Sequence, residues 1–107
     1  MRQILAFGLA LGAFSLAAMA GTFTGTLMDA MCKDQNPVAH TRKCAIGCAK
    51  SGLGLVTAGG KFLKFDPAGN EKALAALKAS KKENDLKARV TGTLEGETLK
   101  VESIQIQ

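Results

Sequence analysis

The strictest pattern in this 107-residue chain is an alternation from Leu86 to Leu94. Every second residue there is apolar or glycine, and the residues between them are Lys, Arg or Thr. Successive side chains of a strand point to opposite faces, so this pattern predicts a strand with one buried face. The same period of two recurs from Gly21 to Leu27, where Thr occupies every second position. The chain is therefore expected to be built mainly of strands.

Three more strands and a helix are predicted after the first strand. Two short apolar runs, Leu53 to Thr57 and Lys61 to Phe65, flank a Gly-Gly pair and predict a β-hairpin. The stretch Glu71 to Ser80 predicts a helix with one apolar face and Asn70 as its N-cap. The stretch Thr98 to Ile106 predicts the last strand.

The apolar positions of that last strand change phase along its length. Leu99 and Val101 share one parity, whereas Ile104 and Ile106 share the other. A slip of one residue turns a strand's side chains to the opposite face, so one extra residue is needed between the two pairs. The sequence therefore predicts a β-bulge near Glu102 and Ser103.

Another helix is predicted from Val38 to Lys50, closed by Gly52. The complete order is then strand, helix, strand, strand, helix, strand, strand. Five strands with a helix between the third and the fourth is the order of an OB-fold barrel. The chain is thus expected to be mainly β with two short helices. It would form a five-stranded OB-like barrel with a helical insert between strands one and two, and a small α+β sandwich is the alternative.

The first twenty residues have the pattern of a secretory signal peptide. Arg2 precedes an apolar run from Ile4 to Ala18, and Ala18-Met19-Ala20 forms an A-x-A cleavage site. The run is shorter than the ~20 apolar residues of a membrane-spanning helix, so we expect it to be removed as a leader and expect no membrane span in the mature chain. The alternative is that the run is retained as an N-terminal membrane anchor. The mature chain, residues 21–107, is then a single small domain. Its expected location is the periplasm or the outside of the cell, where disulfides persist.

Basic residues are spread along the chain and give it a net charge of +5. Scattered lysines are typical of a solvated surface, and they could also favour contact with an anionic envelope polymer. Trp and Tyr are absent, so a platform for base stacking is poorly supplied and no nucleic acid partner is expected. The expected partner is an envelope protein or polymer that the sequence does not identify.

All three cysteines and the only histidine lie within a stretch of 17 residues, as Cys32, His40, Cys44 and Cys48. If the predicted helix includes them, His40, Cys44 and Cys48 follow one another at steps of four residues and share one broad stripe. Cys32 would approach that stripe from the preceding loop.

The first interpretation of this cluster is a disulfide from Cys32 to Cys44 or to Cys48. Helical Cys44 and Cys48 are poor partners for each other, because their Cβ vectors run parallel. Closing a loop of this length would contribute about 3 kcal/mol to stability. The third thiol would be buried, reactive, or paired with a second copy in a disulfide-linked homodimer. On this interpretation the protein is a non-catalytic binding or interaction module.

A second interpretation is a metal site. Cys32, His40, Cys44 and Cys48 together are the donor set of a Cys₃His zinc site. Soft sulfur ligands would also suit Cu(I), and Met28 and Met31 flank Cys32, although core packing is expected for both.

A third interpretation is a thiol redox protein. The C-x-x-C spacing of thioredoxin-like proteins is absent. Asp29 or Asn36 could orient a Cys–His nucleophile, although Asp29 is expected to act as a turn or helix-cap acceptor. No catalytic residue is assigned on this basis.

Several motifs resemble those of a group of small, largely uncharacterised exported bacterial proteins. The segment from Gly25 to Cys32 matches their G-x-L-x-D-x-x-C start, and Cys44 and Cys48 match a C-x-x-x-C that follows it. The segments 90–94 and 99–104 match their C-terminal V-x-G-x-L…L-x-V-x-S-I strand pair. The resemblance covers nearly all of the mature chain, and it implies a fold and an exported location but no activity.

Overall fold

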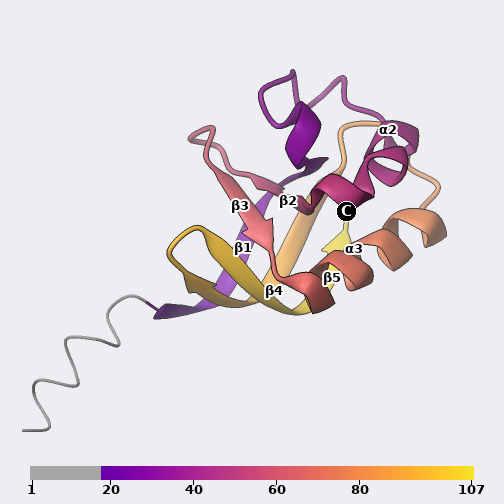
Figure 1. Ribbon diagram of the computed structural model, residues 1–107. Coiled ribbons are helices and arrows are strands. Elements are labelled where there is room, and N and C mark those ends of the chain that lie inside the picture. Colours follow the sequence, from indigo (N-terminus) through magenta and orange to yellow (C-terminus); the bar gives the residue numbers. More distant parts are fainter. Residues whose placement is uncertain (1–17) are drawn as a thin grey trace, which may run out of the picture.

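A computed structural model of the protein describes residues 18–107 (Figure 1). Most of the predicted leader, including Arg2, lies outside the described residues. Among residues 18–107, no helix is both long enough and apolar enough to cross a membrane. The predicted order of strands and helices is confirmed. The elements are β1 (Ala18–Asp29), the short 3₁₀ helix η1 (Ala30–Cys32), α2 (Arg42–Gly47), the 3₁₀ helix η2 (Ala49–Ser51), β2 (Leu53–Val56), β3 (Phe62–Phe65), α3 (Pro67–Ala79), β4 (Lys87–Glu95) and β5 (Thr98–Ile106).

The five strands close into a barrel in the order β1-β2-β3-β5-β4. All neighbours in it are antiparallel except β3 and β5, which are parallel. The chain is therefore mainly β with an OB-like barrel, as its sequence predicts. The insert that contains α2 lies between β1 and β2, and α3 lies between β3 and β4. In Figure 1 the insert covers one end of the barrel, where α2 packs beside α3.

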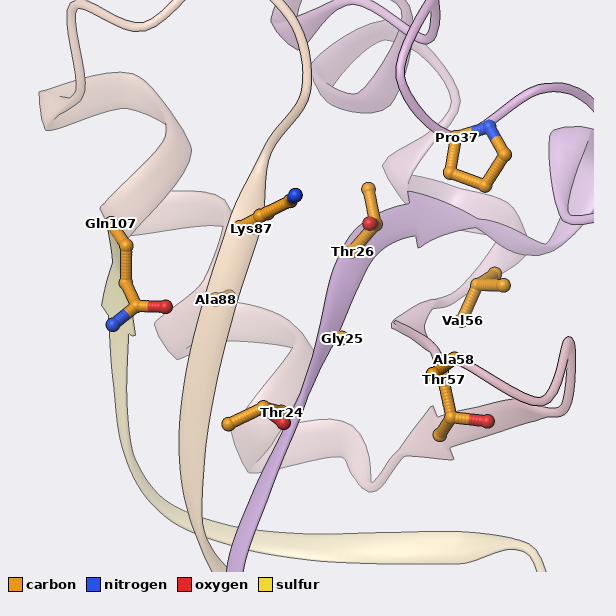
Figure 2. Close-up of a pocket in the computed structure, with 10 residues that line it drawn as sticks. All are labelled: Thr24, Gly25, Thr26, Pro37, Val56, Thr57, Ala58, Lys87, Ala88 and Gln107. Carbon is orange, nitrogen blue, oxygen red and sulfur yellow. The ribbon is translucent and has the colours of Figure 1, made fainter.

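The first strand is long because it pairs with two different neighbours. Ala18 to Thr26 pair with β4, whereas Thr26 to Asp29 pair with β2. Gly25 lies where the strand changes partner (Figure 2), and a Cβ at this position would lie 2.6 Å from the carbonyl oxygen of Val56. Glycine thus permits the close approach of β1 and β2 shortly before β1 leads into the insert.

The predicted β-bulge in β5 is confirmed. Thr91 pairs with Ser103, but the next residue of β4, Gly92, pairs with Val101. Glu102 is therefore the extra residue, and it restores the alternation on either side of the bulge.

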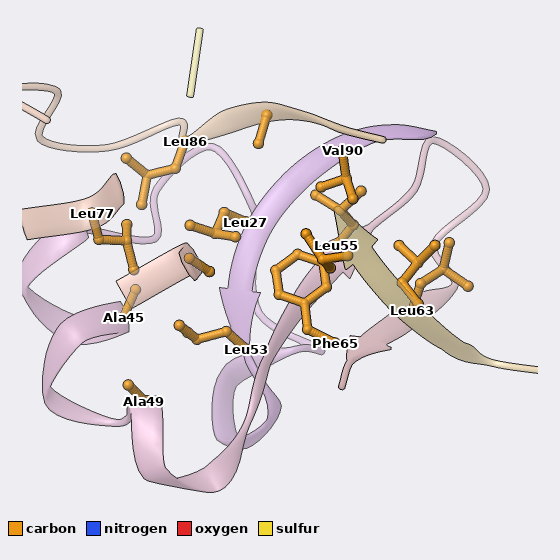
Figure 3. Close-up of a cluster of buried hydrophobic side chains, with 14 residues drawn as sticks. Leu27, Ala45, Ala49, Leu53, Leu55, Leu63, Phe65, Leu77, Leu86 and Val90 are labelled. Atoms are coloured by element: carbon orange, nitrogen blue, oxygen red, sulfur yellow. The ribbon is translucent and has the colours of Figure 1, made fainter. Parts of the chain in front are cut away.

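The core lies inside the barrel and extends beneath both helices (Figure 3). Alternate residues of the strands point inward, as their period of two predicts. Side chains of α2 and α3 close one end of this core, so the insert is anchored to the barrel by apolar contacts. The fully buried residues of the cluster are Leu27, Ala45, Leu53, Leu55, Ala73, Leu77, Leu86, Ala88, Val90 and Leu99.

The longer helix, α3, begins earlier than predicted. Pro67 is its first residue, and the N-cap is Asp66, so the prediction of Asn70 as the cap is wrong. Proline at the first helical position is favoured because its missing N–H needs no partner there. Asn70 instead joins two elements: its side chain accepts a hydrogen bond from the N–H of Leu53 (2.6 Å) and donates one to the carbonyl oxygen of Ala49 (3.3 Å).

Candidate metal centre

Asp29 ends β1 and is completely buried. Its Oδ2 atom accepts a hydrogen bond from the N–H of Cys32 at 3.2 Å, so the carboxylate caps η1. This confirms the expected role of Asp29 as a cap acceptor. The cap also places the backbone of Cys32 directly beside the carboxylate.

His40 does not lie in a helix, so the prediction of a helix from Val38 to Lys50 is wrong at both ends. The helix α2 begins at Arg42, because the side chain of Thr41 caps it by accepting the N–H of Cys44 (3.1 Å). At the other end Cys48 is the C-cap, and a separate 3₁₀ turn follows. The predicted stripe of one histidine and two cysteines is therefore broken.

The imidazole of His40 is buried against Asp29. Its side chain is 2% exposed, and Nε2 lies 2.9 Å from Oδ1 of Asp29. The two atoms lie at hydrogen-bond distance, yet within the described residues neither makes a hydrogen bond. Buried polar atoms without partners are rare and cost about 1–3 kcal/mol each. The two atoms lie at ion-pair distance, and a cation bonded to both would give each of them a partner.

Cys32 brings a sulfur to the same place. The donor atoms of Asp29, Cys32 and His40 all lie within 4.8 Å of one another, so that one metal ion could contact all three. A carboxylate oxygen, a thiolate sulfur and an imidazole nitrogen are all zinc ligands, and three protein ligands leave a fourth position open. The hard oxygen makes the set better suited to Zn²⁺ than to Cu(I).

The surroundings of Cys32 favour the protonated form of its thiol. Burial is the main cause that raises its pKa above the ordinary value of 9.0, followed by the charge of Asp29 and a hydrogen bond to it. The thiols of Cys48 and Cys44 raise the pKa further. A metal ion would have to displace the thiol proton, because the thiolate is the form that binds metals.

The other two cysteines lie outside this group. Cys44 is exposed in the first turn of α2, and Cys48 is partly buried at the end of that helix. The structure thus brings together only Cys32 and His40 of the four predicted ligands, and it adds Asp29 to them. Across residues 18–107 all three cysteines are free thiols, so the disulfide of Cys32 with Cys44 or Cys48 stays a prediction.

The methionines that flank Cys32 differ in their environments. Met28 is completely buried, which confirms that it packs in the protein interior. Met31 is 73% exposed, so the expectation of core packing is wrong for this residue. As the middle residue of η1, it points away from the barrel interior, with the short turn holding it at the surface.

The surface of residues 18–107 includes hollows of about 210, 530 and 570 Å³. The smallest, of about 210 Å³, is lined by His40 and Cys44 together with Gln35, Asn36, Ala39 and Thr41, and it adjoins the group of Asp29, Cys32 and His40 at His40. A groove of about 530 Å³ crosses the outer face of β1 (Figure 2); its one charged lining residue, Lys87, lies 3.9 Å from Asp85. The third, of about 570 Å³, lies between η2, β3 and the start of α3. Of these three hollows on the described residues, the smallest is the one whose lining combines a thiol with an imidazole.

Asp29 is the member of this group that is missing from the predicted Cys₃His donor set. The signal for it is the D-x-x-C spacing: a carboxylate that caps the turn holding the cysteine is necessarily close to it. Comparisons of this chain with protein families, with curated proteins and with solved structures found no match.

Proposed function

We propose that this protein binds a zinc ion through Asp29, Cys32 and His40. The observation that supports the proposal is the buried contact between Oδ1 of Asp29 and Nε2 of His40, in which neither atom makes a hydrogen bond. A cation between these atoms and the sulfur of Cys32 would give each of them a partner. It would also compensate the buried negative charge of the carboxylate.

The placement of the three donors agrees with this role. Two of them are held by backbone structure: Asp29 by its pairing in β1, and Cys32 by the turn that Asp29 caps. His40 is held between the preceding turn and the capped start of α2. Ligands fixed before the ion arrives lose little conformational freedom on binding, which favours affinity.

Zinc titration of the purified, reduced protein tests the proposal. A chromophoric chelator competes for the metal, and elemental analysis gives the stoichiometry. We expect one zinc per chain, with binding lost in His40→Ala and retained in Cys48→Ser, which changes a thiol outside the donor group. A wild-type protein that leaves all zinc with a weak chelator would overturn the proposal.

A second candidate is the non-catalytic binding or interaction module stabilised by a disulfide of Cys32. It is favoured by the three free thiols that η1, α2 and the end of α2 hold within one insert. Such a module would work in the periplasm or outside the cell, with an envelope protein or polymer as its partner. Intact mass after alkylation, with and without reduction, tests it: one blocked thiol supports the disulfide, and three blocked thiols count against it.

A further inference from the structure

The hollow beside the proposed zinc site adjoins the ligand group at one residue. His40 is both a member of the ligand group and part of the wall of the 210 Å³ hollow. Asp29 is fully buried, and the side chain of His40 is almost fully buried. Cys32 is partly exposed, but Asp29 and His40 are closed off from solvent, and the hollow reaches the group on the side of His40.

Cys44 is the sulfur donor on this hollow. It is exposed to solvent and lines the same surface as His40. Its backbone is fixed, since its N–H is bonded to the capping side chain of Thr41. Among the described residues, however, Cys44 is not one of the donors that lie within 4.8 Å of one another. Its sulfur thus stands on the approach to the site and outside the site itself.

We propose that this hollow is the route by which zinc enters and leaves, and that Cys44 is a transit ligand on that route. The inference rests on the proposed zinc site at Asp29, Cys32 and His40. The partner it implies is a donor or acceptor that holds zinc through exchangeable ligands. A protein with such a route is suited to passing a metal ion on, because the ion can leave without unfolding of the site.

The transfer is a ligand exchange in which the oxidation state of zinc does not change. A bond from zinc to the Cys44 sulfur forms as a ligand of the donor leaves, and the thiol proton goes to solvent. Zinc then bonds to His40, Asp29 and the Cys32 sulfur, which releases its own proton. The bond to Cys44 breaks, and Cys44 takes a proton back from water. Release follows the same steps in reverse.

Cys48 provides the matched control. It lies four residues from Cys44 on the same short helix, but it is the C-cap, is partly buried, and does not line the hollow. Replacing either sulfur by oxygen changes the chain by one atom. A difference between the two variants therefore reflects the position of the replaced sulfur, because each variant loses one thiol.

The test measures rates and affinity separately by stopped-flow mixing of the reduced protein with zinc and with a chromophoric chelator. In Cys44→Ser we expect loading and release to slow equally, by about tenfold, with an unchanged Kd. In Cys48→Ser we expect wild-type rates and affinity. Wild-type protein in which Cys44 is selectively alkylated at the surface provides a second measurement, and it should show the same slowing.

Two results would overturn the transit role. One is a Cys44→Ser variant that exchanges zinc at the wild-type rate. The other is a Cys44→Ser variant whose affinity falls more than tenfold, because Cys44 would then be a resident ligand. A wild-type protein that binds no zinc overturns the proposed function itself, and this outcome is visible before any variant is compared.

Discussion

Replacing Asp29 by asparagine separates the two tasks of this carboxylate. The amide side chain would keep one oxygen, which can still accept the N–H of Cys32, but it loses the negative charge that faces His40. The loss of a hydrogen-bonding charge costs about 1.5–3 kcal/mol, and the relief of a buried charge offsets part of it. We therefore expect the metal-free variant to be about 1–2 kcal/mol less stable than the wild type.

The effect on zinc should be larger. A neutral amide is a poor zinc ligand, so we expect the affinity of Asp29→Asn to fall about 100-fold, or ~2.8 kcal/mol. At a zinc concentration 100 times the wild-type Kd, binding stabilises the wild-type protein by about 2.7 kcal/mol. For a domain of this size that raises Tm by about 10–20 °C. At the same concentration the variant would gain only about 0.4 kcal/mol, or ~2–3 °C.

The assay is thermal unfolding with and without zinc, followed by circular dichroism. Asp66→Asn is the matched control, because Asp66 is also a capping carboxylate: its Oδ1 accepts the N–H groups of Gly69 (3.0 Å) and Val101 (3.1 Å). The control should lose metal-free stability but keep the full zinc-dependent rise in Tm. A folded Asp29→Asn protein with the wild-type rise would refute the reasoning.

Three further predictions concern single residues. Because folding raises the pKa of Cys32 above 9.0, its contribution to metal-free stability is present below that pH and is lost as the pH rises through the folded value. Urea unfolding should therefore show a steeper alkaline loss for the wild type than for Cys32→Ser, and equal slopes would contradict this. Zinc and a disulfide compete for Cys32. Oxidised glutathione, which takes two electrons and two protons from a pair of thiols, should therefore block zinc binding, and bound zinc should slow disulfide formation. Mass spectrometry of zinc-loaded and zinc-free protein after this treatment measures both effects. Gly92→Ala should destabilise the protein by about 1–3 kcal/mol, since its Cβ would collide with the carbonyl oxygen of Lys100, and unchanged stability in urea would count against the tight bulge geometry.

The barrel could be predicted because the alternation of apolar and polar residues in each strand shows which face is buried. The alternation from Leu86 to Leu94 is reproduced in β4, where the inward residues Ala88 and Val90 are fully buried. The phase change around Glu102 likewise located the bulge, since a bulge is the local way to correct a slip of one residue. Both signals are local sequence patterns. Such a pattern predicts the structure correctly where no tertiary contact overrides it.

The candidate site was harder to predict, because its contacts come from outside the local pattern. The helix that was to contain His40 is shortened by Thr41, which caps α2 and also bridges to Asn84 in the distant loop before β4. A helix start that is fixed by a contact with a distant segment cannot be recognised from the periodicity of the local sequence. Asp29 was correctly interpreted as a cap, but its second oxygen faces His40 only because the insert folds back over the end of β1.

The three proposed ligands come from only twelve consecutive positions, Asp29 to His40. Closing so short a loop costs little entropy, whereas closing the barrel requires Thr22 to find Thr91, which is distant in the sequence. Zinc could therefore gather its donors before the barrel has formed. Barrels with distant pairings fold slowly, and an early metal-bound turn at the end of β1 would remove one step from that search. Zinc would then act as a folding nucleus, increasing the rate of folding as well as decreasing the rate of unfolding.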